Sequence, residues 1–195
     1  MRKHLRLDEY KVLLYRILLA YVFYFFARIL FYLFNAKLLK VDSIADFLSL
    51  CYYGIPFDTT AILYVNVLFI VLSILPFRKN TNAGYQKFLF YLYFATNLLA
   101  YATNFVDLIY YKFTYARTTT AVMNVIEHEV NLSKLFTSFL VDFWYVFVLF
   151  FVFAALWIYA YTRVKVSAAK PIKNLHYYGF SVVGFLFFSL LIIGG

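Results

Sequence analysis

The stretch from Val12 to Phe34, VLLYRILLAYVFYFFARILFYLF, decides the fold class of this chain. Apart from Arg16 and Arg28, every residue in it is aliphatic or aromatic. The hydrocarbon core of a bilayer is about 30 Å thick and an α-helix rises about 1.5 Å per residue, so about 20 apolar residues are needed to cross it. The stretch therefore predicts a transmembrane helix.

Four further stretches have the same length and character. We expect them at about 59–77, 88–110, 139–161 and 177–195. The rest of the chain is too small to bury five apolar helices, so lipid must cover them. The sequence thus predicts an all-α fold, a polytopic integral membrane bundle of five transmembrane helices with short interfacial helices in its outer loops. Residues 1–195 form a single transmembrane domain in this interpretation.

The overall composition agrees with a membrane protein. The 195 residues are 65% hydrophobic and 24% aromatic, only 14% are charged, and the mean hydropathy is +0.79. A water-soluble domain carries about 25% charged residues. Disordered segments are poor in the aromatic and aliphatic side chains that dominate here. A soluble enzyme and an intrinsically disordered chain are therefore excluded.

The distribution of the cations predicts the topology. Cytoplasmic loops of membrane proteins carry an excess of Lys and Arg. Eleven of these residues lie in the N-terminal tail and in the loops after the second and fourth stretches, against five in the other two loops. The N-terminus is therefore expected in the cytoplasm and the C-terminus outside. Topology explains the net charge of +9, and nucleic acid is not expected as a partner.

Two outer loops are expected to rest on the membrane surface. Ser43 and Asp46 resemble a capping pair at the start of a short helix that should end at Gly54 and Pro56. The apolar residues of this helix recur at helical spacing: Ile44, Phe47, Leu48 and Cys51. The loop 112–138 has the same spacing at three positions: Met123, Ile126 and Val130.

Arg28 is the most informative polar residue within the stretches. A charged side chain in hydrocarbon costs about 2.5–3.5 kcal/mol on insertion scales, so Arg28 needs a partner. Asp58, Asp107 and Asp142 lie at the same outer ends. Two interpretations stay open: an ion pair that fixes helix packing, or a cleft in which the guanidinium binds the phosphate of a lipid headgroup. Arg16, near the inner end, is expected to extend to the interface.

Polar residues form two stripes at helical spacing. The stripe that shares a face with Arg28 comprises Tyr21, Tyr24, Tyr32 and Asn35. The stripe of the third stretch comprises Tyr93, Asn97, Tyr101, Asn104 and Tyr111, with Asp107 beside it. We expect the two stripes to face each other or a watery cleft, where hydroxyl and amide groups bond across helices.

No catalytic or metal site is predicted within the chain. We find no nucleophile paired with a base, no carboxylate dyad and no phosphate-binding glycine loop. Glu127, His128 and Glu129 are adjacent, and adjacent residues of a helix point in different directions, which favours a solvated loop over a metal site. Cys51 is the only cysteine, so no internal disulfide can form.

Two short segments carry a resemblance to a known family. Gly54-Ile55-Pro56-Phe57-Asp58 is similar to a Gly-Leu-Arg-Phe/Tyr-Asp motif, with Pro56 where arginine is usual. The second segment is similar to Asp-x-x-Tyr-Tyr/Phe-x-Phe-x-x-x-Arg, on Asn104, Asp107, Tyr110, Tyr111, Phe113 and Arg117. Both motifs, with a five-helix layout, resemble the lipoteichoic acid synthase family of membrane sulfatase-like phosphotransferases in the alkaline phosphatase superfamily.

The resemblance implies that the bundle is the N-terminal part of a longer protein. A large extracellular α/β domain with a threonine nucleophile and a divalent metal, usually manganese, would follow residue 195. Such enzymes transfer phosphoglycerol from phosphatidylglycerol, and relatives transfer phosphoethanolamine or act as sulfatases. The implied location is the cytoplasmic membrane of a bacterium, and the implied partners are membrane lipids, among them anionic phospholipid, and the catalytic domain.

The resemblance also assigns a role to the polar residues of the bundle. The bundle would anchor the catalytic domain and orient a lipid headgroup. The candidate residues are Arg28, Asp58, Asn97, Asn104, Asp107 and Arg117. The same polar stripes also fit a small polytopic transporter or channel subunit. A non-catalytic membrane scaffold is the third interpretation.

Overall fold

The computed structural model describes residues 7–39, 41, 43–75, 82–115, 137, 140–166 and 174–194. The regular secondary structure in these ranges is helical, which confirms the predicted all-α class. The helices are α1 (Leu7–Leu39), α2 (Ile44–Val65), α3 (Val67–Ile74), α4 (Ala83–Thr114), α7 (Trp144–Arg163) and α8 (Asn174–Gly194). α1, α4, α7 and α8 overlap the first, third, fourth and fifth expected stretches, and α1 and α4 extend beyond theirs at both ends.

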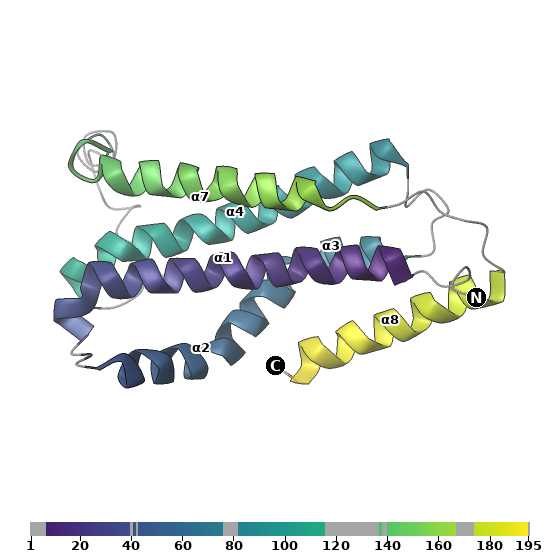
Figure 1. The fold of residues 1–195 in the computed structure, drawn as a ribbon, viewed down its shortest axis with the longest axis horizontal. Coiled ribbons are helices and arrows are strands. Elements are labelled where there is room, and N and C mark those ends of the chain that lie inside the picture. The colour runs from purple at the N-terminus through teal and green to yellow at the C-terminus, as the bar shows by residue number, and fades with distance from the viewer. Residues whose placement is uncertain are drawn as a thin grey trace, which may run out of the picture.

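The helices lie side by side around α1 (Figure 1). α4 and α7 pack against α1 and against each other, and α2 contacts α1 from the opposite side in this view. α3 packs against α4 and α8. α1 and α4 run in the same direction along the long axis, and α7 runs in the opposite direction (Figure 1). The outcome is a helical bundle in which α1 touches most of the other elements.

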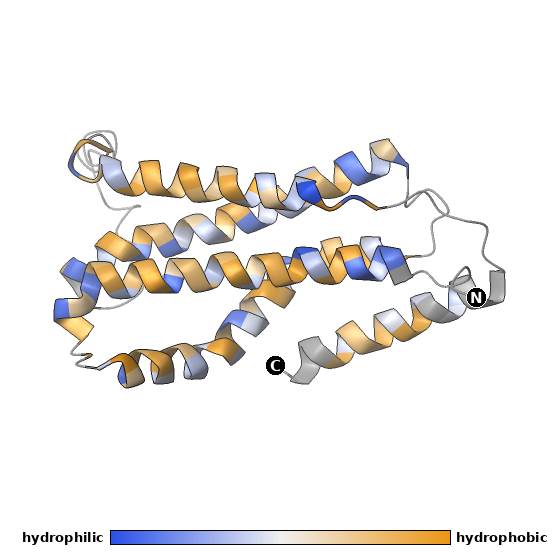
Figure 2. Cartoon of the chain, in the orientation of Figure 1, coloured by the Kyte–Doolittle hydropathy of each residue, from blue (hydrophilic) through white to orange (hydrophobic). Residues whose placement is uncertain are grey.

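The surface of the bundle is strongly apolar. Each described helix exposes large hydrophobic side chains. Hydrophilic residues gather near the helix ends (Figure 2). Within the described residues, α1 and α7 are long and apolar enough to cross a membrane, and the bent pair α2–α3 adds a third candidate if it counts as one span. α4 falls outside this set because its polar stripe lowers its hydropathy. These features fit a helical membrane protein.

The second expected stretch differs from the prediction. The helix that begins after Ser43 does not end at Gly54 and Pro56 but continues to Val65 with Pro56 inside it. The predicted cap is confirmed, since the Ser43 hydroxyl accepts a hydrogen bond from the backbone N–H of Asp46 at 3.1 Å. α2 changes direction along its length (Figure 1), as expected of a helix that contains proline.

A sharper bend separates α2 from α3. The two helices meet at Asn66 with an angle of 61° between them. The Asn66 side-chain amide donates to the carbonyl of Ile62 at 2.9 Å, the same carbonyl that accepts from the Asn66 backbone N–H. Side-chain bonds of this kind compete with the backbone ladder and bend helices. The predicted single span 59–77 is thus two helical segments.

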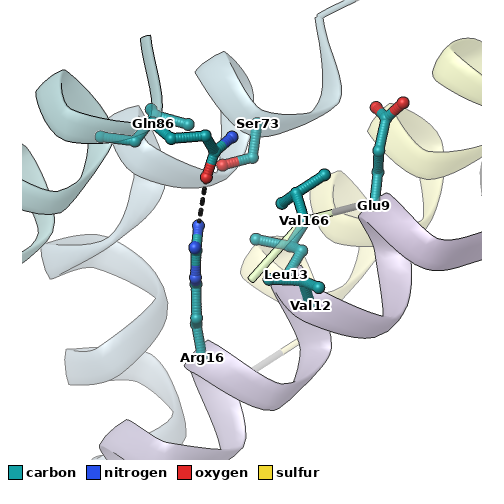
Figure 3. Close-up of a pocket in the computed structure, with 8 residues that line it drawn as sticks. Glu9, Val12, Leu13, Arg16, Ser73, Gln86 and Val166 are labelled. Atoms are coloured by element: carbon teal, nitrogen blue, oxygen red, sulfur yellow. Dashed lines mark hydrogen bonds between the residues drawn. The ribbon is translucent and has the colours of Figure 1, made fainter. Parts of the chain in front are cut away.

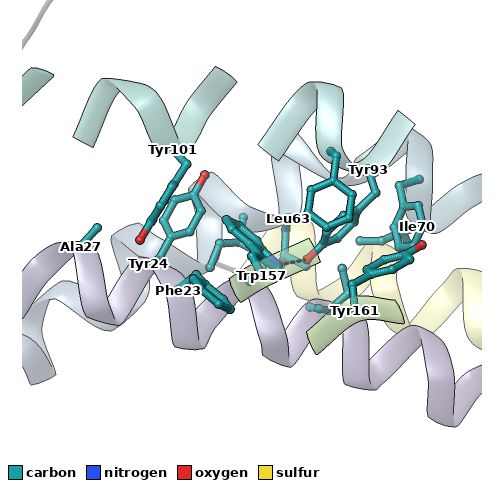
Figure 4. Packing of buried hydrophobic residues seen from close by; sticks show 14 of the residues in the cluster. Phe23, Tyr24, Ala27, Leu63, Ile70, Tyr93, Tyr101, Trp157 and Tyr161 are labelled. Carbon is teal, nitrogen blue, oxygen red and sulfur yellow. Dashed lines mark hydrogen bonds between the residues drawn. The ribbon is translucent and has the colours of Figure 1, made fainter. Parts of the chain in front are cut away.

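An aromatic core joins α1, α4 and α7 (Figure 4). The rings of Phe23 and Trp157 stack with centroids 4.8 Å apart. Trp157 donates from its indole N–H to the Tyr93 hydroxyl at 3.1 Å, and that hydroxyl donates to the Arg16 carbonyl at 2.8 Å. Buried tyrosine and tryptophan need such partners for their polar atoms. One chain of hydrogen bonds therefore connects α7, α4 and α1.

A reciprocal amide pair connects the α2–α3 bend to α4. Asn66 donates to the Asn97 side-chain oxygen at 3.0 Å, and Asn97 donates to the Asn66 side-chain oxygen at 2.7 Å. Both residues are fully buried. Each amide also donates to the carbonyl four residues earlier in its own helix. Because all four N–H groups are satisfied, the pair fixes the position of the bend against α4.

Breaking one half of this pair should destabilise the bundle. Asn97→Leu leaves the buried Asn66 amide without its partner, so we expect the free energy of unfolding to fall by about 1–2 kcal/mol. The measurement is an unfolding titration with sodium dodecyl sulfate in mixed micelles. In the double variant Asn66→Leu/Asn97→Leu both polar groups are gone, and most of the loss should be recovered. Additive losses in the double variant would contradict a coupled pair.

Candidate functional site

The depth of the two arginines in α1 sets the demands on the site. α1 has 33 residues and is therefore about 50 Å long, against a hydrocarbon core of about 30 Å. Measured along the axis, Arg28 lies about 8 Å and Arg16 about 10 Å from the middle of α1, on opposite sides of it. Both positions fall within the core of a bilayer centred on the helix, whose half-thickness is about 15 Å. Each guanidinium therefore needs polar partners.

Arg28 finds its partners on α2. Its Nη2 lies 2.5 Å from a carboxylate oxygen of Asp58 and donates to the carbonyl of Gly54 at 3.2 Å. The side chains of Arg28 and Asp58 are 17% and 25% exposed, so the ion pair is accessible. The other guanidinium N–H groups of Arg28 have no hydrogen-bond partner among the described residues. The pair thus presents both charges at the junction of α1 and α2.

Gly54 lets the guanidinium reach the backbone of α2. A Cβ atom at this position would overlap the Nη1 and Cζ atoms of Arg28, so a side chain there would have to displace the guanidinium. Glycine in a helix interior costs about 0.5–1 kcal/mol relative to alanine. The close approach of the Arg28 guanidinium explains why glycine occupies position 54 in spite of this cost. Sequence reasoning used Gly54 only as a helix end, because the contact depends on how two helices cross.

A buried tyrosine and the cysteine complete the junction. The Tyr24 hydroxyl is buried and has no hydrogen-bond partner among the described residues. It interacts electrostatically with Asp58. Cys51 is also buried and lies within electrostatic reach of Arg28 and Asp58. A buried hydroxyl without a partner is unusual and leaves hydrogen-bonding capacity unused. We call Tyr24, Arg28, Gly54 and Asp58 the α1–α2 junction site.

Two of the other candidate residues have hydrogen-bond partners away from this site. Asn97 pairs with Asn66 at the α2–α3 bend. Asn104 is half-buried and donates to the carbonyl of Ala100 in its own helix at 3.3 Å. Asp107 is buried on α4, and Arg117 lies outside the described residues. Of the six candidate residues, the structure brings Arg28 and Asp58 together.

The two polar stripes meet only in part. The Tyr24 and Tyr101 rings are 6.0 Å apart, so these residues do face each other. Asn35 donates to the backbone carbonyl of Leu108 at 3.3 Å and joins α1 to α4 without a side-chain partner. Tyr32 instead packs on Phe47 of α2 with ring centroids 4.7 Å apart. Cross-helix bonding is therefore confirmed for α1 and α4, but it involves carbonyl groups that no sequence pattern marks.

Arg16 does not extend to the interface as the sequence analysis expects. The residue is only 6% exposed, its Nη1 donates to the side-chain oxygen of Gln86 at 3.1 Å, and its guanidinium lies 4.3 Å from the centre of the Tyr161 ring. Contacts from α4 and α7 hold the side chain inward. Gln86 carried no signal in the sequence because a polar residue near a helix start is common.

The described residues contain no group of three His, Cys, Asp or Glu side chains that could hold a metal ion. The segment Glu127–Glu129 and the apolar residues of loop 112–138 after Tyr115 fall outside the described residues, apart from residue 137. Comparison with protein-family models, with curated proteins and with solved structures gave no match for this chain. The functional argument therefore rests on the residues themselves.

Enlarging Gly54 should open the junction site. In Gly54→Ala the new methyl group must displace the Arg28 guanidinium, so we expect a loss of about 1–3 kcal/mol in the free energy of unfolding. The reaction rate of the Cys51 thiol with a maleimide should rise, because the displaced guanidinium uncovers α2. Both quantities can be measured on the purified protein in detergent.

Gly179→Ala is the matched control. Gly179 also lies in a helix, but a Cβ atom there meets nothing within 4 Å. The substitution should leave the Cys51 rate unchanged and raise stability by up to about 1 kcal/mol through helix propensity. Equal effects of the two substitutions would show that the Arg28 contact is not the cause.

Proposed function

We propose that this chain is the membrane anchor of an extracellular phosphotransferase and that its α1–α2 junction site positions a lipid headgroup. The observation that carries the proposal is the accessible ion pair of Arg28 and Asp58 at a depth where lipid phosphates are within reach. A pair that served packing alone would have little reason to keep guanidinium N–H groups unoccupied. An ionisable residue within a membrane helix is by default a hypothesis for a functional site.

The chemistry of the pair matches the headgroup of a phospholipid. The planar guanidinium offers parallel N–H groups that fit two phosphate oxygens. The Asp58 carboxylate accepts hydrogen bonds from the hydroxyl groups of a phosphoglycerol headgroup or from the ammonium of phosphoethanolamine. The unpartnered Tyr24 hydroxyl adds a further donor beside them. Holding the headgroup in this way lowers the entropy cost of a reaction at its phosphate.

The motif at residues 54–58 supports the proposed family. Gly54 and Asp58, its first and last residues, are the two α2 residues that contact Arg28. The first and last residues of the motif therefore both serve to hold the Arg28 guanidinium. The proposal includes the remaining features of that family: five spans, a cytoplasmic N-terminus in a bacterial membrane, and a metal-dependent catalytic domain after residue 195.

A transporter or channel subunit is the second candidate because of the α2–α3 bend. Discontinuous helices form the substrate sites of many transporters near the middle of the membrane. Here the bend is at Asn66, where the hydrogen-bonding groups of the paired amides point to each other and to their own helices. The polar groups of the bend are thus used internally, and this favours the headgroup site at Arg28 over a transport site at Asn66.

The headgroup proposal predicts a loss of lipid binding without Arg28. We expect Arg28→Gln to weaken the binding of phosphatidylglycerol about tenfold or more, because a charge-assisted bidentate contact is lost. Arg28→Lys should lose part of the affinity for phosphatidylglycerol, since an ammonium group lacks the planar fork of a guanidinium. Binding is measured by titrating the full chain in nonionic detergent and counting bound lipids by native mass spectrometry.

Arg163→Gln controls for the change in net charge. Arg163 is exposed and its guanidinium lies 4.4 Å from the centre of the Tyr159 ring, so the substitution removes the same charge outside the junction. This variant should bind phosphatidylglycerol as the unchanged chain does. Equal affinity of Arg28→Gln and the unchanged chain, with both folded, would leave Arg28 a purely structural residue.

The anchor proposal predicts an outward C-terminus. Alkaline phosphatase fused after Gly195 should be active, because this reporter folds only outside the cytoplasm, and the same reporter fused after Lys79 should be inactive. The reading frame is expected to continue past Gly195 into an α/β domain. An inactive fusion at Gly195 would contradict the five-span topology, whereas a stop codon there would contradict the anchor role and leave the headgroup site to be judged by lipid binding.

A further inference from the structure

The second arginine of α1 carries a charge that the protein does not balance. Arg16 is buried, and its two contacts are the neutral amide of Gln86 and the ring of Tyr161. No described acid lies within ion-pair distance of its guanidinium. Arg28 on the same helix has Asp58, so the two arginines are in different electrostatic situations.

Among the described residues, the acids at this end of the bundle are Asp8 and Glu9, in the first turn of α1. Glu9 lies at the rim of the Arg16 pocket and does not point towards the guanidinium (Figure 3). In the sequence, segments 1–6, 76–81 and 167–173 contain cations and no acid.

A small pocket opens at this end of the bundle. It has a volume of about 20 Å³, and Glu9, Arg16, Ser73 and Gln86 line it together with four apolar residues (Figure 3). A space of this size holds about one water-sized group, such as a single oxygen atom of a larger molecule. The Nε atom of Arg16 is buried and has no hydrogen-bond partner among the described residues. The pocket thus combines an unused donor with room for one acceptor.

A buried guanidinium without an anion is strongly unfavourable. An amide acceptor and an aromatic ring offset only part of the lost hydration. The described residues do not supply the compensating negative charge. At about 10 Å from the middle of α1, Arg16 lies within about 5 Å of the edge of the hydrocarbon core, next to the level of the lipid phosphates.

We infer that Arg16 and its pocket bind the phosphate group of an anionic phospholipid from the leaflet at the N-terminal end of α1. One phosphate oxygen enters the pocket and accepts a hydrogen bond from Arg16 Nε, while the remainder of the headgroup stays outside among the cations. Lys87, exposed near this end, adds favourable charge. This site is separate from the α1–α2 junction site and lies towards the opposite end of α1.

Two substitutions test the inference from opposite directions. Arg16→Gln removes the donor and the charge. Gln86→Glu places a carboxylate where the Arg16 Nη1 already finds an acceptor at 3.1 Å, so the protein supplies its own anion. Because Gln86 is on α4 and contacts Arg16, which lies about 18 Å along α1 from Arg28, Gln86→Glu reports on this site alone. It also keeps the inference testable if Arg16→Gln fails to fold.

The measurement is the thermal unfolding midpoint of the full chain in nonionic detergent, recorded against added phosphatidylglycerol, phosphatidylcholine or inorganic phosphate. For the unchanged chain we expect a rise that saturates with phosphatidylglycerol, because a ligand that binds the folded state stabilises it. The apparent affinity should fall about tenfold or more in Arg16→Gln and in Gln86→Glu. Arg163→Gln is the control for surface charge and should keep the affinity.

Each outcome decides the inference. A higher starting midpoint for Gln86→Glu, with a weakened response to phosphatidylglycerol, supports an anion at Arg16. If inorganic phosphate raised the unfolding midpoint as much as phosphatidylglycerol does, the ligand of the pocket would be free phosphate and not a lipid. Equal responses to phosphatidylglycerol in the unchanged chain, Arg16→Gln and Gln86→Glu would overturn the inference and leave a water molecule as the occupant of the pocket.

Discussion

The cost of placing two guanidinium groups inside one membrane-length helix constrains the rest of this bundle. α1 is long enough to cross a bilayer and carries Arg16 and Arg28 on either side of its middle. Each group loses its hydration there and must regain polar contacts from the helices beside it. α2 supplies an acid and a carbonyl to Arg28, whereas α4 and α7 supply an amide and a ring to Arg16.

These contacts determine how closely the helices approach. The backbone of α2 comes so near to Arg28 that a side chain at position 54 would have to displace the guanidinium. The α2–α3 bend then keeps the segment after Val65 in contact with α4, and the buried amides of Asn66 and Asn97 hold the bend. Aromatic stacking between α1 and α7 fills the space between the two arginines. Apolar packing thus occupies the middle of α1, and polar contacts lie on either side of it.

The difference between the two arginines has a functional meaning. Arg28 has a carboxylate partner and unused donors in an accessible position, which suits a headgroup that brings both acceptors and donors. Arg16 has no carboxylate, is less exposed and faces a pocket for a single atom, which suits a phosphate oxygen alone. With both proposed sites, α1 would contact lipid headgroups in both leaflets. These contacts would fix the vertical position of the bundle in the bilayer.

The sequence by itself determined the helical class, the approximate helix ranges, the cap at Ser43 and the need of Arg28 for a partner. These follow from hydropathy, length and local spacing along one helix. Only the tertiary structure decided that Asp58 is that partner rather than Asp107 or Asp142, that Asn97 bonds to Asn66, and that Arg16 turns inward. Spacing shows which residues share a face of a helix, but the rotation and crossing of neighbouring helices decide which faces meet. The contact at Gly54 depends on both.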